Sequence, residues 1–124
     1  MSTNGAAAAA PAGHYHQVAA DLRSPTRDLR KAIPDTWAGF AQLHQSAMAE
    51  GALPTKVKEL MALVVGVTKH CDGCVAYHAR AAAAAGATED EVVEALGVAL
   101  LMEGGPASVW APRALEAFRE FAAS

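Results

Sequence analysis

The chain has 124 residues, of which 52% are hydrophobic and 6% aromatic, and its formal net charge is −3. This length is typical of a single domain, and the apolar fraction is large enough for a buried core. The small negative charge argues against a nucleic-acid partner, and no apolar run approaches the ~18 residues that a membrane span requires. The alanine-rich composition favours an all-α fold over a β-sandwich.

The first segment, Met1–Gly13, is rich in alanine and shows no apolar periodicity. We therefore predict a disordered N-terminal arm, followed by one helical domain over residues 14–124. The segment also lacks a basic stretch followed by an apolar one, so no secretory signal is expected and a cytoplasmic location is predicted.

Two helices are predicted next. Residues 16–31 carry an apolar stripe, but Pro25 interrupts it, which leaves one kinked helix or two shorter pieces as alternatives. Residues 34–50 then repeat apolar side chains at helical spacing, and Gly51 is expected to close this second helix.

A third helix is predicted over residues 55–68, because Pro54 suits a helix start and apolar side chains follow at helical spacing. Beyond Glu59 this helix is apolar all round, which is typical of a central helix. A β-strand over residues 63–67 is the alternative interpretation of the same apolar run.

Three more helices complete the predicted bundle. The fourth covers residues 71–85. Thr88 and Glu91 have the spacing of a capping box, which starts the fifth helix, and the sequence Gly104-Gly105-Pro106 ends it. The sixth helix is expected over residues 107–122.

Cys71 and Cys74 are separated by two residues at the predicted start of the fourth helix. At this spacing two side chains share one helix face, so their sulfurs can form a reversible disulfide. The partial positive charge of a helix N-terminus favours the thiolate, which is the species that attacks peroxides and disulfides. In a reducing compartment, two neighbouring cysteines are more typical of catalysis or metal binding than of a structural disulfide.

His78 and Glu59 are the candidate proton-transfer residues. His78 follows Cys74 by four positions, which places its imidazole one helical turn along on the same face. It can accept the thiol proton directly or through a water. Glu59 has small and apolar helical neighbours, and desolvation there would make its carboxylate a better proton acceptor. Its alternative role is to complement the dipole at the helix start.

The pattern Glu59-x11-Cys71-x2-Cys74-x3-His78 resembles the core motif of the alkylhydroperoxidase AhpD-like proteins, within the carboxymuconolactone decarboxylase superfamily. The sequences Lys58–Leu63 and Cys74–His78 resemble it as well, and the likeness extends from about residue 34 to residue 105. Where the best-known members have a histidine between the cysteines, this chain has Gly73.

The resemblance implies an all-helical AhpD-like bundle of about six helices, assembled as a trimer or hexamer, and an oxidoreductase that reduces peroxides or a partner's disulfide. Cys74 would attack the peroxide after Glu59 removes its proton through His78 and a water. Cys71 would then resolve the sulfenic acid into a disulfide, which a thiol or lipoyl-bearing partner protein would reduce. No cofactor, metal ion, membrane or nucleic acid is expected.

Alternative interpretations remain for the same residues. A lyase of the carboxymuconolactone decarboxylase type would use Glu59 and His78 for proton transfer and leave the cysteines as bystanders. The decarboxylase branch of the superfamily lacks the cysteine pair, so the pair favours the redox branch. A non-catalytic helical oligomer that senses oxidation is another possibility. A zinc site that recruits His70 and His78 is disfavoured, because zinc requires four ligands and no second C-x-x-C follows.

Overall fold

The computed structural model describes residues 13–123, and every regular element within that range is an α-helix. The helices follow one another as α2 (His14–Ala32), α3 (Pro34–Met48), α4 (Thr55–Thr68), α5 (Asp72–Ala84), α6 (Glu89–Glu103) and α7 (Ala107–Ala122). The predicted all-α fold of about six helices is confirmed. The predicted disordered arm falls, apart from Gly13, outside the described residues. None of the described helices is long and apolar enough to cross a bilayer.

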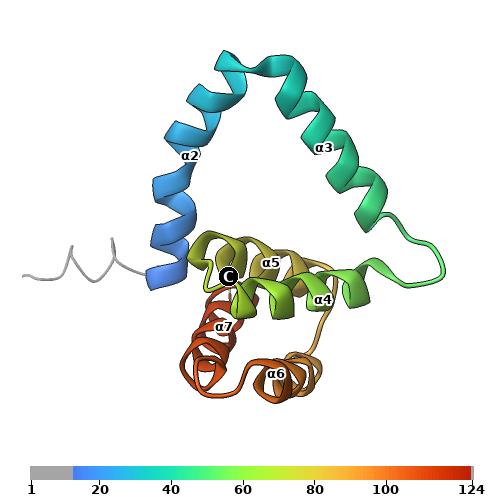
Figure 1. Ribbon diagram of the computed structural model, residues 1–124, viewed down its shortest axis with the longest axis vertical. Helices are drawn as coiled ribbons and strands as arrows, with labels where there is room; N and C mark the ends of the chain where they lie inside the picture. The colour runs from blue at the N-terminus through green and yellow to red at the C-terminus, as the bar shows by residue number, and fades with distance from the viewer. Residues whose placement is uncertain (1–12, 124) are drawn as a thin grey trace, which may run out of the picture.

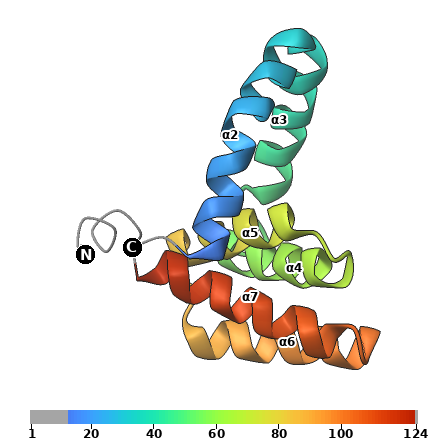
Figure 2. The same ribbon diagram turned by 90° about the vertical axis from the view of Figure 1, so that its left-hand side faces the viewer.

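The molecule consists of an arch and a base (Figure 1). α2 and α3 form the arch, and the other four helices form the base in two layers, with α4 and α5 next to the arch and α6 and α7 beyond them (Figure 2). α7 packs closely on α5 and α6 because four of its buried positions are alanines. These alanines are Ala107, Ala111, Ala114 and Ala117.

α2 is one continuous helix, so the alternative of two separate pieces is wrong. Pro25 lies inside it, exposed to solvent. Proline lacks an N–H and therefore removes one intrahelical hydrogen bond, but on an exposed face water can replace that partner. The helix also begins earlier than predicted, at His14, and it buries Tyr15 completely.

α3 begins at Pro34 as predicted but ends at Met48, two residues before the predicted end. None of its residues is buried, and Phe40 and Leu43 are both exposed. The helical periodicity of this segment was therefore a correct indication of a helix. It does not indicate that the apolar side chains of α3 are buried within the described chain.

α4 is helical throughout, so the strand alternative for residues 63–67 is wrong. One face buries Glu59, Leu63 and Val67 in the base, whereas Met61 and Val65 on the other face are exposed. The prediction of a central helix is therefore correct for one face only.

The predicted capping box at the start of α6 is confirmed. The Glu91 N–H donates to Thr88 Oγ1 at 3.1 Å, and the Thr88 N–H donates to Glu91 Oε1 at 2.9 Å. Just before it, Gly86 ends α5 with φ of +90°, a conformation that glycine adopts without a steric penalty. Gly86 and the capping box thus form the turn that connects α5 in one layer of the base to α6 in the other.

Leu63 provides a test of the core. Its side chain is 0% exposed where α4 packs on the other helices of the base. Leu63→Ala is therefore expected to lower the free energy of unfolding by about 2–5 kcal/mol. Met61→Ala is the matched control, because Met61 is on the same helix but 55% exposed. Urea denaturation measures both, and equal midpoints for the two variants would contradict the assigned core.

Candidate active site

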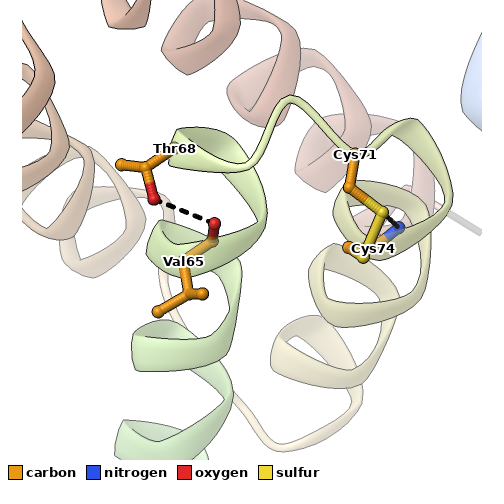
Figure 3. Close-up of a disulfide and its surroundings, with 4 residues drawn as sticks. All are labelled: Val65, Thr68, Cys71 and Cys74. Atoms are coloured by element: carbon orange, nitrogen blue, oxygen red, sulfur yellow. Dashed lines mark hydrogen bonds between the residues drawn. A yellow bond between two sulfur atoms is a disulfide. The ribbon is translucent and has the colours of Figure 1, made fainter.

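Cys71 and Cys74 form a disulfide at the start of α5 (Figure 3). Cys71 is the N-cap residue of the helix, and the two Cα atoms are 5.2 Å apart. The backbone N–H of Cys74 donates a hydrogen bond to Cys71 Sγ at 3.1 Å. The helix N-terminus thus presents a hydrogen-bond donor to this sulfur, a contact that favours negative charge there.

Gly66 lets α4 approach α5 closely beside Cys74. An added Cβ at Gly66 would lie 3.1 Å from the Cys74 Cβ, so a larger residue there would push the helices apart. The turn between α4 and α5 is also stabilised beside Gly66, because the Cys71 N–H donates a hydrogen bond to the Gly66 carbonyl at 3.1 Å. Thr68 adds a hydrogen bond to the Val65 carbonyl at 3.0 Å (Figure 3). The disulfide is therefore held against the end of α4.

Glu59 and His78 meet across the interface between α4 and α5. His78 Nδ1 lies 2.8 Å from Glu59 Oε1, and Glu59 is only 4% exposed. A carboxylate in this position fixes the orientation of the imidazole ring. Because Nδ1 is engaged, Nε2 is the ring nitrogen left for another partner, and Cys74 lies one turn earlier on α5.

The four predicted site residues therefore come from one pair of packed helices. Cys71 and Cys74 lie where α5 begins, and His78 follows one turn later, paired with Glu59 from α4. Together they combine two sulfurs, an imidazole and a buried carboxyl group. Such a set can support either thiol chemistry or proton transfer.

His70 faces away from this set. Its ring stacks on Trp110 with centroids 5.4 Å apart, and its Nε2 lies 2.8 Å from Glu103 Oε2. The backbone of His70 adopts φ of +53°, which is uncommon for a residue with a side chain. His70 is therefore occupied with α6 and α7 and does not join His78 in a ligand set. Between residues 13 and 123, no group of three or more His, Cys, Asp or Glu side chains is arranged to hold a metal.

Gly73, between the cysteines, faces α2. An added Cβ there would lie 3.1 Å from Leu22 Cδ1, so a histidine at this position would require the Leu22 side chain to shift. Gly73 also lies at one end of a groove of about 760 Å³ between α2 and α5. The side chains along it are mainly apolar or cationic, including Leu22, Arg23, Arg27, Arg30, Tyr77 and Arg80.

The sequence interpretation missed Tyr15 and Asp72. The Tyr15 hydroxyl donates to Asp72 Oδ1 at 3.0 Å, so the first turn of α2 contacts the residue that follows Cys71. Nothing in the local pattern indicates this contact, because the two residues are 57 positions apart in the chain.

Comparison with known proteins places the chain in a family. The model of the carboxymuconolactone decarboxylase family matches residues 34–117, which include all four predicted site residues. An uncharacterized protein of Cupriavidus necator is 37% identical over 90 residues, which are 73% of this chain and 80% of that protein.

Solved structures agree with this placement. A carboxymuconolactone decarboxylase family protein from Legionella pneumophila has a TM-score of 0.85 at 39% identity, covering 87% of this chain and 96% of that one. Another family member, from Thermotoga maritima, for which a role in an antioxidative response has been suggested, has a TM-score of 0.67 at 30% identity, covering 77% and 85%. This chain therefore belongs to the carboxymuconolactone decarboxylase family, within the AhpD-like superfamily.

Proposed function

We propose that this protein is a thiol-dependent peroxide reductase. The observation that carries the proposal is the disulfide Cys71–Cys74 beside the buried pair of Glu59 and His78, on two helices packed against each other. A disulfide alone fits a structural role, and a Glu–His pair alone fits many roles. Their combination supplies a thiol, a resolving thiol and a proton acceptor in one place.

The proposed reaction starts from the reduced dithiol. The Cys74 thiol transfers its proton to His78, whose imidazolium is stabilised by Glu59. The thiolate attacks the terminal oxygen of the peroxide, so an S–O bond forms, the O–O bond breaks, and the leaving alkoxide takes a proton and departs as an alcohol. Cys71 then attacks the resulting sulfenic acid, which forms the disulfide and releases water. The disulfide in the structure corresponds to the state after this step.

A thiol or lipoyl-type protein is the proposed reductant, because two electrons must return to the disulfide in each cycle. Reduction of a partner's disulfide by the same dithiol is the related activity. We also propose a homo-oligomer. The support is the set of exposed apolar side chains on the arch, which a second copy could cover. They include Leu22, Leu29, Phe40 and Leu43.

A lyase of the decarboxylase type is the second candidate. The observation that favours it is the Glu59–His78 pair, which can transfer protons without any thiol. The two candidates differ in one respect: lyase activity persists after both thiols are alkylated, whereas peroxide reduction stops.

The Cys71→Ser variant tests the proposed division of roles between the thiols. We expect it to consume about one peroxide per chain in a single turnover and then stop, because Cys74 can still be oxidised but no disulfide can close. Stopped-flow peroxide consumption, together with mass spectrometry of a trapped sulfenic acid, measures this directly. Wild-type protein with both thiols alkylated is the control and should consume none.

Two results would contradict the proposal. Full multiple turnover by Cys71→Ser would remove the resolving role of Cys71. If alkylated wild-type protein consumed peroxide as fast as the reduced protein, no thiol would be involved and the redox function itself would be wrong.

A further inference from the structure

The carboxylate of Asp72 is held by the first turn of α2. Asp72 lies between the two cysteines and is the first residue of α5. Its Oδ1 accepts the hydrogen bond from the Tyr15 hydroxyl at 3.0 Å, and its Oδ2 lies 3.5 Å from His14 Nε2. Both carboxylate oxygens are therefore directed to α2, whereas Cys74 lies against Gly66 of α4.

Tyr15 is well placed to be a permanent donor. Its side chain is 0% exposed. Burial, and then its hydrogen bond to Asp72, raise the pKa of its hydroxyl well above the usual range, and Arg113 opposes this shift only partly. The phenol is therefore neutral and keeps its proton throughout the range in which thiols ionise.

Glu120 of α7 fixes the backbone around Tyr15. It accepts hydrogen bonds from the N–H groups of Tyr15 and His16 at 3.1 and 3.0 Å, which caps the start of α2. Burial works to raise the pKa of Glu120, but the hydrogen bonds from His16 and Tyr15 outweigh it and lower that pKa. The ionised carboxylate thus anchors the turn that carries Tyr15, so this hydroxyl has a fixed position relative to α5.

An unrestrained carboxylate at position 72 would disfavour the reduced enzyme. A negative charge close to a thiolate destabilises it by repulsion. A hydrogen bond from Tyr15 spreads the charge of Asp72 and keeps the carboxylate on the α2 side of α5. We propose that Tyr15 is a positioning residue which, through Asp72, stabilises the thiolate form of the Cys71–Cys74 pair and sets how readily its disulfide is reduced. This inference rests on the redox function proposed above.

The proposal predicts shifts of opposite sign for two conservative variants. Tyr15→Phe keeps the buried ring but releases Asp72, so the pKa of the reactive thiol should rise by about half a unit. The thiolate fraction at neutral pH then falls, and alkylation by iodoacetamide should slow about threefold. Asp72→Asn removes the charge, so that pKa should fall and alkylation at neutral pH should accelerate about threefold. Equilibration with dithiothreitol should move in parallel, toward the disulfide for Tyr15→Phe and toward the dithiol for Asp72→Asn.

The double variant distinguishes positioning from a structural role. If Tyr15 acts through Asp72, then Tyr15→Phe/Asp72→Asn should have the thiol pKa of Asp72→Asn alone. Tyr77→Phe is the matched control: Tyr77 is also on α5, and its hydroxyl lies 3.4 Å from His44 Nε2 rather than on Asp72. This control should leave the thiol pKa unchanged.

Three outcomes would overturn the inference. One is an unchanged thiol pKa in Tyr15→Phe with a lower melting temperature, which would make the hydrogen bond purely structural. Another is additive shifts in the double variant. The third applies if Tyr15→Phe does not fold: an unchanged thiol pKa in Asp72→Asn then overturns the inference by itself. Since these measurements use no peroxide, a wild-type protein that fails to turn over peroxide but shows the predicted shifts would contradict only the proposed function.

Discussion

Replacing Cys74 with serine is expected to reduce thiol-dependent peroxide turnover to the uncatalysed background. In the proposed reaction the Cys74 sulfur forms the new bond to oxygen, and a hydroxyl group is far less ionised than a thiol at neutral pH. Serine is close to cysteine in size, so the contact of this side chain with Gly66 should be kept and the fold should be retained. Steady-state peroxide consumption with a dithiol reductant measures the effect, and circular dichroism checks the fold.

Cys71→Ser is the matched comparison for this experiment, because each cysteine has a feature that favours it as the attacking thiol. Cys71 Sγ accepts the N–H of Cys74, whereas Cys74 lies one turn before His78. If single-turnover consumption is lost in Cys71→Ser but kept in Cys74→Ser, the two thiols have the reverse roles. Unchanged multiple turnover in Cys74→Ser would remove the redox assignment altogether.

The second large effect is expected for Glu59→Gln. Glutamine has nearly the same shape and can still hydrogen bond to His78 Nδ1, but it carries no charge to stabilise the imidazolium. We expect the second-order rate constant with peroxide to fall by about 10²–10⁴-fold at neutral pH, the usual contribution of general acid–base catalysis. The loss should shrink as the pH approaches about 8.5, where a free cysteine thiol ionises without help.

Glu94→Gln is the matched control for Glu59→Gln. Glu94 is an exposed carboxylate on α6, so its replacement should leave the rate and its pH profile unchanged. A Glu59→Gln enzyme with the wild-type rate at neutral pH would show that the buried carboxylate takes no part in thiol activation. An equal loss at every pH would indicate a disturbed site rather than a missing proton acceptor.

Most helix positions could be predicted from local sequence signals. Pro34 starts α3, Thr88 and Glu91 cap α6, and α7 runs over the residues that the apolar spacing predicts. These signals work because capping and proline geometry depend on neighbours within one or two turns. The end of α3 was less predictable, since helix ends depend on small differences between competing turn conformations.

Burial was less predictable than helix position. Apolar residues on α3 and on the outer face of α4 have helical spacing but are exposed in the described chain, including Phe40, Leu43, Met61 and Val65. Periodicity reports which face of a helix is apolar. It does not report whether the same chain or another copy covers that face.

The candidate site, like the fold, could be predicted only in part from the sequence. The sequence by itself determined that Cys71, Cys74 and His78 lie together, because they fall within two turns of one helix and their spacing alone brings them close. Only the tertiary structure decided that Glu59 meets His78, that His70 turns to Glu103, and that Tyr15 reaches Asp72. These contacts join residues that are 19, 33 and 57 positions apart in the chain. Their geometry depends on how side chains pack between helices, and no local pattern encodes that packing.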